Sequence, residues 1–397
     1  MSWGYEKLSI IAPSKPLKHP VISNSEKVWM LNLDMVEANS GQVIGKQKSP
    51  LSTAGSSTHW FDTSHVLYSK LRPYLNKVVM PDEEGLATTE LVPLKPDSKR
   101  LDRAYLTYYL RSKTFVDWIS EQVAGAKMPR VSMNVFWNHE IPIPFPDDPA
   151  KSLAEQKRIA SILDKADAIR RKRKQAIQLA DDFLRSVFLD MFGDPVTNPK
   201  GWEVKELKKL TIKLGSGSTP RGGKEAYLEE GISLIRSLNI HDNRFVHKNL
   251  AFLSDEQAEK LKNVVIEKND LLLNITGASV CRATLVDNKI LPARVNQHVC
   301  IVRVKEDVIL PTYIARLITA KSYKQKLMSI ATAGGATREA LTKQQVESLE
   351  IIVPPIELQK KFEMIVIKIL DMLENAETQN KKPLFDSLSQ KAFAGEL

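Results

Sequence analysis

The most constraining feature of the sequence is the stretch from Leu153 to Phe192, which contains neither proline nor glycine. Without a helix breaker, these residues can form one helix of ~40 residues, roughly 60 Å long. Core-type side chains recur along it at alternating intervals of three and four, which is the spacing of a helix that packs along a seam against another helix. The predicted seam positions are Ile159, Ile162, Ala166, Ile169 and Phe183.

A second stretch near the end of the chain repeats this pattern at a constant shift of 203 residues. Because the register of the core-type positions is the same, the two helices are predicted to pack against each other. Pro383 interrupts the second copy. A proline removes a helical hydrogen bond and clashes with the preceding turn, so a break or kink is expected there. The seam positions of the second helix are Phe362, Ile365, Ile369 and Met372.

The repeat extends backwards from each helix. Residues Gly125–Pro144 align with Gly335–Pro354 at a constant shift of 210, and both halves place a tyrosine, Tyr105 or Tyr313, before a helix-like run. The sequence therefore predicts one globular domain followed by one long helix, present twice. The predicted boundaries are 1–145 for the first globular domain, 146–194 for the central helix, 195–353 for the second globular domain and 354–397 for the last helix.

Each globular domain is predicted to mix strands and helices, so the fold class is α/β. In the first domain the expected strands are Val28–Met35, His65–Leu71 and Leu91–Leu94, and the expected helix is Ala104–Ile119. In the second domain the expected strands are Ile232–Ile240, Asp270–Thr276 and Val299–Lys305, and the expected helices are Asp255–Lys262 and Thr312–Lys326.

The charge balance favours a polyanionic partner. Among 397 residues, 57 are lysine or arginine and 47 are aspartate or glutamate, which leaves a net charge of +10. An excess of this size gives a positive field that attracts nucleic acid. The two cysteines suggest a reducing compartment, and no apolar run reaches the ~18 residues of a membrane span. We therefore expect a cytoplasmic protein that does not associate with membranes.

A search for catalytic motifs yields mismatches. Gly217–Lys224 imitates a phosphate-binding loop, but Glu225 stands where a magnesium-binding hydroxyl is needed. The Pro354-Pro355 pair lacks the polar and aromatic neighbours that adenine methylation requires, and the histidines lack metal-ligand spacing. The sequence therefore predicts no catalytic residue and no metal site.

Both globular domains instead carry basic and amide side chains interleaved with aromatic ones. Arginine and lysine suit phosphates and guanine, whereas asparagine and glutamine can pair with adenine. The candidate DNA-binding residues of the first domain are Lys70, Arg72, Tyr74, Asn76, Lys77, Lys127 and Arg130. Those of the second domain are Arg221, Arg236, Asn239, Asn274, Thr276, Arg282, Arg294, Asn296, Gln297 and Arg338.

Motifs over nearly the whole chain resemble those of the specificity subunit of Type I restriction-modification enzymes. The helical motifs are EQKRIASILDKADAI, FLRSVFLDMFGDP, PPIELQKKFE and SQKAFAGEL. The looser matches in the globular domains are YSKLRPYLNKV, TTEL, GSGSTP, ITGAS and VNQHV.

This resemblance implies a non-catalytic DNA-recognition protein. Two target-recognition domains would each read one half of a bipartite DNA site, and the long helices would form an antiparallel coiled coil between domains in pseudo-twofold arrangement. The coiled coil would set the spacer and dock two methyltransferase subunits, and restriction subunits would complete the enzyme. The resemblance further implies no cofactor in this chain, because S-adenosylmethionine, ATP and Mg²⁺ belong to the partner subunits.

Two other classes of protein stay open. A solitary coiled-coil scaffold or DNA-binding protein would explain the helices, but a scaffold alone leaves the repeated basic domains unexplained. A stand-alone DNA methyltransferase or nuclease is disfavoured, because the catalytic motifs are missing.

Overall fold

The computed structural model describes residues 2–18, 22–125, 128–219, 223–333, 339–378 and 384–397. The chain forms two compact units. Unit 1 comprises Met1–Gln175 and Glu377–Leu397, and unit 2 comprises Ala176–Ala376. Both units mix helices and strands, which confirms the predicted α/β class.

Among the described residues, unit 1 contains two small sheets, a terminal strand pair and a second strand pair formed by β9 and β10. The sheets have strand orders β3-β2-β7-β4 and β6-β5-β8, and β1 pairs with β11. The strands are β1 Trp3–Lys7, β2 Lys27–Leu31, β3 Gln47–Pro50, β4 Thr58–Phe61, β5 Val66–Ser69, β6 Val78–Val79, β7 Gly85–Thr88, β8 Leu91–Leu94, β9 Val123–Ala124, β10 Arg130–Val131 and β11 Glu140–Pro144. The helices are α1 Leu8–Ile11, α2 Arg103–Arg111, α3 Lys113–Glu121, α4 Met133–Asn138, the start of α5 Pro149–Phe192, and α12 Leu384–Ala394.

Unit 2 has nearly the same plan. Its sheets have strand orders β17-β14-β20 and β13-β21-β18-β19, and β12 pairs with β22. The strands are β12 Glu203–Glu206, β13 Thr211–Ser216, β14 Ile232–Ile235, β15 Ile240–His241, β16 Arg244–Phe245, β17 Ala251–Leu253, β18 Leu271–Asn274, β19 Ala283–Leu285, β20 Ala293–Val295, β21 Val299–Val304 and β22 Glu350–Val353. The helices are α6 Leu207–Leu210, α7 Asp255–Glu259, α8 Pro311–Thr319, α9 Lys321–Thr332, α10 Lys343–Glu347 and α11 Ile356–Thr378.

Buried polar side chains confirm that the two units are copies of one frame. The hydroxyl of Tyr105 donates to the carbonyl of Pro142 at 2.8 Å, and that of Tyr313 donates to the carbonyl of Ile352 at 3.0 Å. The fully buried amide of Gln156 bridges two backbone groups at the start of α2 in unit 1, and that of Gln359 does the same before α8 in unit 2. Side chains that satisfy the same buried backbone groups indicate a duplicated core.

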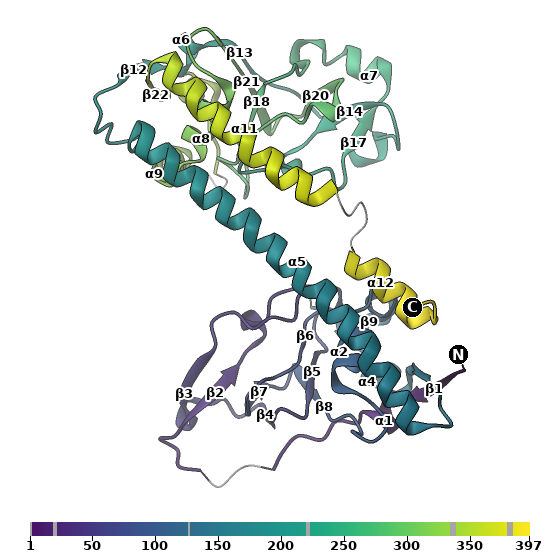
Figure 1. Ribbon diagram of the computed structural model, residues 1–397. Helices are drawn as coiled ribbons and strands as arrows, with labels where there is room; N and C mark the ends of the chain where they lie inside the picture. Colours follow the sequence, from purple (N-terminus) through teal and green to yellow (C-terminus); the bar gives the residue numbers. More distant parts are fainter. Residues whose placement is uncertain (1, 19–21, 126–127, 220–222, 334–338, 379–383) are drawn as a thin grey trace. The chain divides into compact units, whose positions relative to one another are not determined.

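The predicted central helix is present as α5, which runs without interruption through residues of both units (Figure 1). Its first half packs into the core of unit 1 through Ile159, Leu163 and Ala166. Its second half packs into the core of unit 2 through Leu184, Phe188 and Phe192. Within unit 2, Phe362 near the start of α11 contacts Phe188 and Phe192 near the end of α5, with ring centroids 5.6 and 5.5 Å apart. From this contact the two helices run antiparallel (Figure 1).

The seam prediction is only partly correct. Ile159, Ala166 and Phe362 are buried, and Ile365 and Ile369 are partly buried against the unit 2 core. The prediction is wrong at other positions, because Leu163 is fully buried whereas Ile162 is not. Each half of α5 packs on its own globular core, so the position of that core decides which side chains of the helix are buried. The predicted positions that prove to be substantially exposed are Ile169 at 41%, Phe183 at 49% and Met372 at 61%.

Two predicted helices are each divided in two. The expected helix Ala104–Ile119 is α2 and α3, and the expected helix Thr312–Lys326 is α8 and α9. The break falls at Ser112 in unit 1 and at Ala320 in unit 2, where the backbone is extended with ψ of 145° and 138°. Pro383, where a break was predicted, lies outside the described residues; α11 ends at Thr378 and α12 begins at Leu384.

Candidate nucleic-acid interface

Three segments that are distant in sequence meet at one edge of unit 1. We call residues 70–77, 88–90 and 128–131 the unit 1 edge. The backbone N–H of Lys70 donates to the carbonyl of Glu90 at 3.0 Å, and the N–H of Val131 donates to the carbonyl of Lys70 at 2.9 Å. The N–H of Arg72 donates to the carbonyl of Pro129 at 2.8 Å. The loop after β5 is therefore held between the start of β8 and the segment that includes β10.

Unit 2 has the same edge, formed by residues 275–282, 296–298 and 339–341, which we call the unit 2 edge. The N–H of Ile275 donates to the carbonyl of His298 at 2.9 Å, and the N–H of Leu341 donates to the carbonyl of Ile275 at 2.8 Å. The N–H of Gly277 donates to the carbonyl of Glu339 at 3.0 Å. Each bond in unit 1 thus has a counterpart in unit 2.

The loop that follows β5 or β18 has the same shape in both edges. It contains two residues in the left-handed region, Arg72 and Asn76 in unit 1 (φ 50° and 48°) and Gly277 and Cys281 in unit 2 (φ 79° and 65°). Glycine adopts this conformation without steric cost, whereas a side chain makes it unfavourable. The backbone of Arg72, Asn76 and Cys281 is therefore strained. Strained backbone of this kind is common in binding and recognition loops.

The unit 1 edge presents basic and aromatic side chains. Arg72 and Tyr74 are exposed, and neither Lys70 nor Arg72 makes a side-chain hydrogen bond or ion pair with another described residue. The guanidinium of Arg130 donates two hydrogen bonds to the carboxylate of Glu90, at 3.1 and 3.3 Å. Free cationic groups beside a fixed carboxylate suit a partner that combines phosphates with hydrogen-bonding bases.

The unit 2 edge presents different side chains. The hydroxyl of Thr276 lies 2.5 Å from Nδ1 of His298, and the amide oxygen of Gln297 accepts a hydrogen bond from the hydroxyl of Thr219. Arg282 is partly exposed at the end of the loop. Burial, and then the positive charges of Arg282 and Arg244, lower the pKa of His241.

Three of the predicted DNA-binding residues belong to the core, which corrects the prediction. Asn239 and Asn274 are fully buried, and Asn296 is 5% exposed. The amide of Asn239 donates to the carbonyl of Val246, and that of Asn274 donates to the carbonyl of Ser237. Buried amides that support loop backbone cannot also reach a base.

Other predicted residues already hold parts of the fold together. Arg236 donates to the carbonyl of Asn249, and Arg294 donates to that of Ala258 at 3.2 Å. Asn76 and Lys77 donate to the carbonyls of Arg111 and Leu33. Contact between these four residues and DNA stays a prediction. The predicted residues Lys127, Arg221 and Arg338 lie outside the described residues.

The edges also contain Glu90 and His298, which the sequence search did not select as candidates. They directly precede the matching strands β8 and β21, in the motifs TTEL and VNQHV. An alignment of residues 66–78 with residues 271–283, at a shift of 205, would have brought both edges together, but the two segments share little identity. The signal lies in backbone hydrogen bonds between distant segments, which the sequence does not display.

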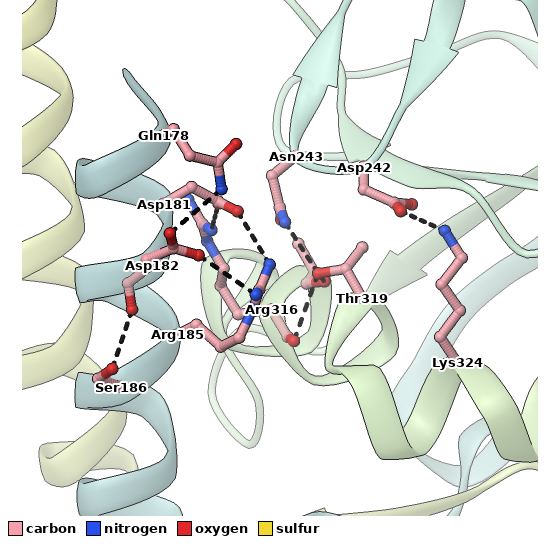
Figure 2. A network of polar contacts seen from close by, with 11 residues as sticks. Gln178, Asp181, Asp182, Arg185, Ser186, Asp242, Asn243, Arg316, Thr319 and Lys324 are labelled. Carbon is pink, nitrogen blue, oxygen red and sulfur yellow. Dashed lines mark hydrogen bonds and ion pairs between the residues drawn. The ribbon is translucent and has the colours of Figure 1, made fainter. Parts of the chain in front are cut away.

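A polar network joins the second half of α5 to the rest of unit 2 (Figure 2). Arg316 on α8 donates to Asp181 on α5 at 2.6 Å, and Asn243 donates to the hydroxyl of Thr319 at 2.9 Å. The network borders a cavity of about 300 Å³ that is also lined by Phe188. Its carboxylates are paired with arginine or lysine side chains, and the Asp181–Arg316 pair docks the helix.

Both cysteines lie among the described residues, and both are buried. Burial raises the pKa of Cys281 to about 12 and that of Cys300 to about 11, so both thiols stay protonated and unreactive near neutral pH. Within the described part of the chain, no group of three or more histidine, cysteine, aspartate or glutamate side chains is placed to hold a metal ion. In the same part of the chain, every helix is too short or too polar to cross a membrane.

Comparison with known protein families gives a match over both halves of the chain. The model of the Type I restriction modification DNA specificity domain matches residues 61–179 and again residues 199–384. The two matched regions fall on the two halves of the duplication and together cover more than half of the chain.

Individual relatives agree with this match. The specificity subunit of the Escherichia coli type I restriction enzyme EcoDI is 25% identical over 233 residues, 57% of this chain and 51% of that subunit, so the match spans about half of the relative's length. The specificity subunit of MjaVIII from Methanocaldococcus jannaschii is 22% identical over 308 residues, 74% of this chain and 69% of that subunit. The crystal structure of a type I restriction-modification S subunit from M. genitalium has the same fold, with a TM-score of 0.55 at 15% identity over 99% of this chain and 96% of that one.

Proposed function

Since the chain belongs to the Type I restriction modification DNA specificity domain family, we propose that it is the non-catalytic subunit that selects the DNA sequence in such an enzyme. Unit 1 reads one half of a bipartite DNA target, and unit 2 reads the other. The observation that carries this proposal is the pair of edges, which share one set of backbone hydrogen bonds and differ in side chains. A duplicated frame with different side chains is suited to reading two different sequences.

The long helix supports a fixed spacing between the two half-sites. Because α5 continues without a break from residues of unit 1 into residues of unit 2, it can hold two readers at a defined separation along a duplex. The bases between the half-sites then need no contact. Together with α11, this helix forms the proposed coiled coil.

Partner subunits supply the catalysis in this proposal. Two methyltransferase subunits bring S-adenosylmethionine, and restriction subunits bring ATP and Mg²⁺; the complex acts in the cytoplasm on double-stranded DNA. The docking of methyltransferase subunits on the helices is supported by three apolar side chains on α11, Met364, Ile367 and Leu370, which are 62%, 51% and 48% exposed at intervals of three residues. Exposed apolar stripes of this kind favour binding to another protein.

Modified-base sequencing of DNA tests the proposal. A host lacking other adenine methyltransferases would carry this chain with its methyltransferase subunit. We expect methylation at a single motif made of two specified half-sites around an unspecified spacer, and none when this chain is omitted. A continuous motif, methylation without this chain, or methylation by this chain alone would contradict the proposal.

A further inference from the structure

The two edges carry side chains of different chemistry at one matched position, which Glu90 occupies in unit 1 and His298 in unit 2. We infer that these residues are a matched pair of specificity determinants, each of which contacts a base edge in its own half-site. The inference rests on the proposed function and adds to it the residues that distinguish the two readers.

The backbone places the two residues equivalently. Each directly precedes a strand, β8 at Leu91 or β21 at Val299. Each offers its carbonyl to the first residue after the neighbouring strand, Lys70 or Ile275, at 3.0 or 2.9 Å. A difference between the two side chains is therefore a difference in chemistry at one place in the frame.

Each side chain is also fixed in orientation by a neighbour from another segment of its edge. Arg130 holds both carboxylate oxygens of Glu90, whose side chain keeps 23% exposure. The Thr276 hydroxyl holds Nδ1 of His298, which is also partly exposed. Exposed ion pairs contribute little to stability, so the Arg130 contact chiefly orients the carboxylate. A preoriented group loses less freedom when it meets a ligand.

The hydrogen-bonding characters of the two groups are opposite. The Glu90 carboxylate only accepts, so in the major groove it suits the exocyclic amino group of cytosine or adenine. When the Thr276 hydroxyl donates to Nδ1, the Nε2–H of His298 is a donor, which suits N7 or O6 of guanine or O4 of thymine. Among the described residues, no side chain or carbonyl is hydrogen-bonded to Nε2 of His298. One frame thus presents an acceptor in unit 1 and a donor in unit 2.

The test uses the full chain in complex with its methyltransferase subunits and maps the methylated motif for Glu90→Gln and His298→Asn. We expect each variant to lose discrimination at one position of one half-site, by roughly tenfold or more in relative methylation, with the two variants affecting different halves. Arg130→Gln keeps the carboxylate of Glu90 but removes the two hydrogen bonds from the guanidinium that orient it. This variant is expected to weaken discrimination at the position that Glu90→Gln affects. The matched controls Glu84→Gln and His247→Asn replace exposed residues outside the edges and should leave the motif unchanged.

The outcomes separate this inference from the proposed function. If the unchanged chain directs methylation to a bipartite motif and neither variant alters base preference, the inference is overturned and the proposed function stands. A uniform fall in methylation at all sites, with base preference retained in a folded variant, would mean that both residues only support the loops and would also overturn it. If the unchanged chain yields no bipartite motif, the proposed function itself fails.

Discussion

Tyr105 in unit 1 and Tyr313 in unit 2 make the same buried hydrogen bond, whereas Arg111 and Thr319, each six residues further along, have different roles. Arg111 is 6% exposed, and its guanidinium pairs with the fully buried Asp167 of α5. Thr319 instead accepts a hydrogen bond from Asn243 and donates one to a carbonyl of its own helix.

This contrast distinguishes two kinds of polar contact in the molecule. Polar groups that satisfy the backbone are alike in both units, because any change would leave a buried N–H or C=O without a partner. The contacts that dock the long helix differ: unit 1 uses a buried ion pair, and unit 2 uses the Asp181 and Arg316 pair, in which the Asp181 side chain is 37% exposed.

The largest effect is expected from Asp167→Ala. Asp167 also pairs with Arg170 and Arg171, at 2.6 and 3.0 Å. Removal of its carboxylate leaves the buried guanidinium of Arg111 without its counter-charge. We expect the free energy of unfolding of unit 1 to fall by about 3–5 kcal/mol. Denaturant titration read by hydrogen exchange would resolve the two units. The matched variant Asp181→Ala should lower the free energy of unfolding of unit 2 by only about 1 kcal/mol. Equal decreases in the two units would contradict the contrast.

A smaller effect, equal in both units, is expected from Gln156→Leu and Gln359→Leu. Each substitution leaves at least one buried N–H and one buried C=O without a partner, which costs about 2–4 kcal/mol. The same titration should give values that agree to within about 1 kcal/mol if the frame is duplicated. A large effect in one unit alone would show that the two buried amides are not equivalent.

The effect that is smallest near neutral pH concerns the titration of His139. Burial lowers the pKa of His139 to about 4 from an ordinary value of 6.5, so the unfolded chain binds a proton in a range where the folded unit 1 does not. The free energy of unfolding of unit 1 should therefore decrease as pH falls from 6.5 towards 4. Leu349 is the matching residue in unit 2. The backbone carbonyls of His139 and Leu349 each accept a hydrogen bond from the first residue of a short helix. His139→Leu should remove this part of the pH dependence; an unchanged profile would assign it to other groups.

Much of this frame can be predicted from the sequence. The absence of proline and glycine identified α5, and the constant shifts of 203 and 210 residues identified the duplication. The face that α5 buries was harder to predict, because Ile162 and Leu163 are equally apolar and only the position of each globular core decides between them. The splits at Ser112 and Ala320 depend on tertiary packing, since the surrounding residues favour a continuous helix.

The candidate site was less predictable. Residue type drew attention to Arg72 and Arg130, which are exposed, but it could not distinguish them from Asn239 and Asn274, whose amides are buried under loop backbone. Glu90 was missed because its neighbour Arg130 lies 40 residues away in sequence. Exposure and long-range hydrogen bonding decide which polar side chains can meet DNA, and neither is a local property of the sequence.

The most direct test of two independent readers is an affinity measurement with the mapped target. The complex with methyltransferase subunits would be titrated with duplexes in which neither half-site, either half-site or both half-sites are scrambled, at one fixed salt concentration. The account predicts the tightest binding to the intact target, weaker binding when either half is scrambled, and the weakest when both are. If scrambling one of the halves left the affinity unchanged, two-unit reading would be contradicted.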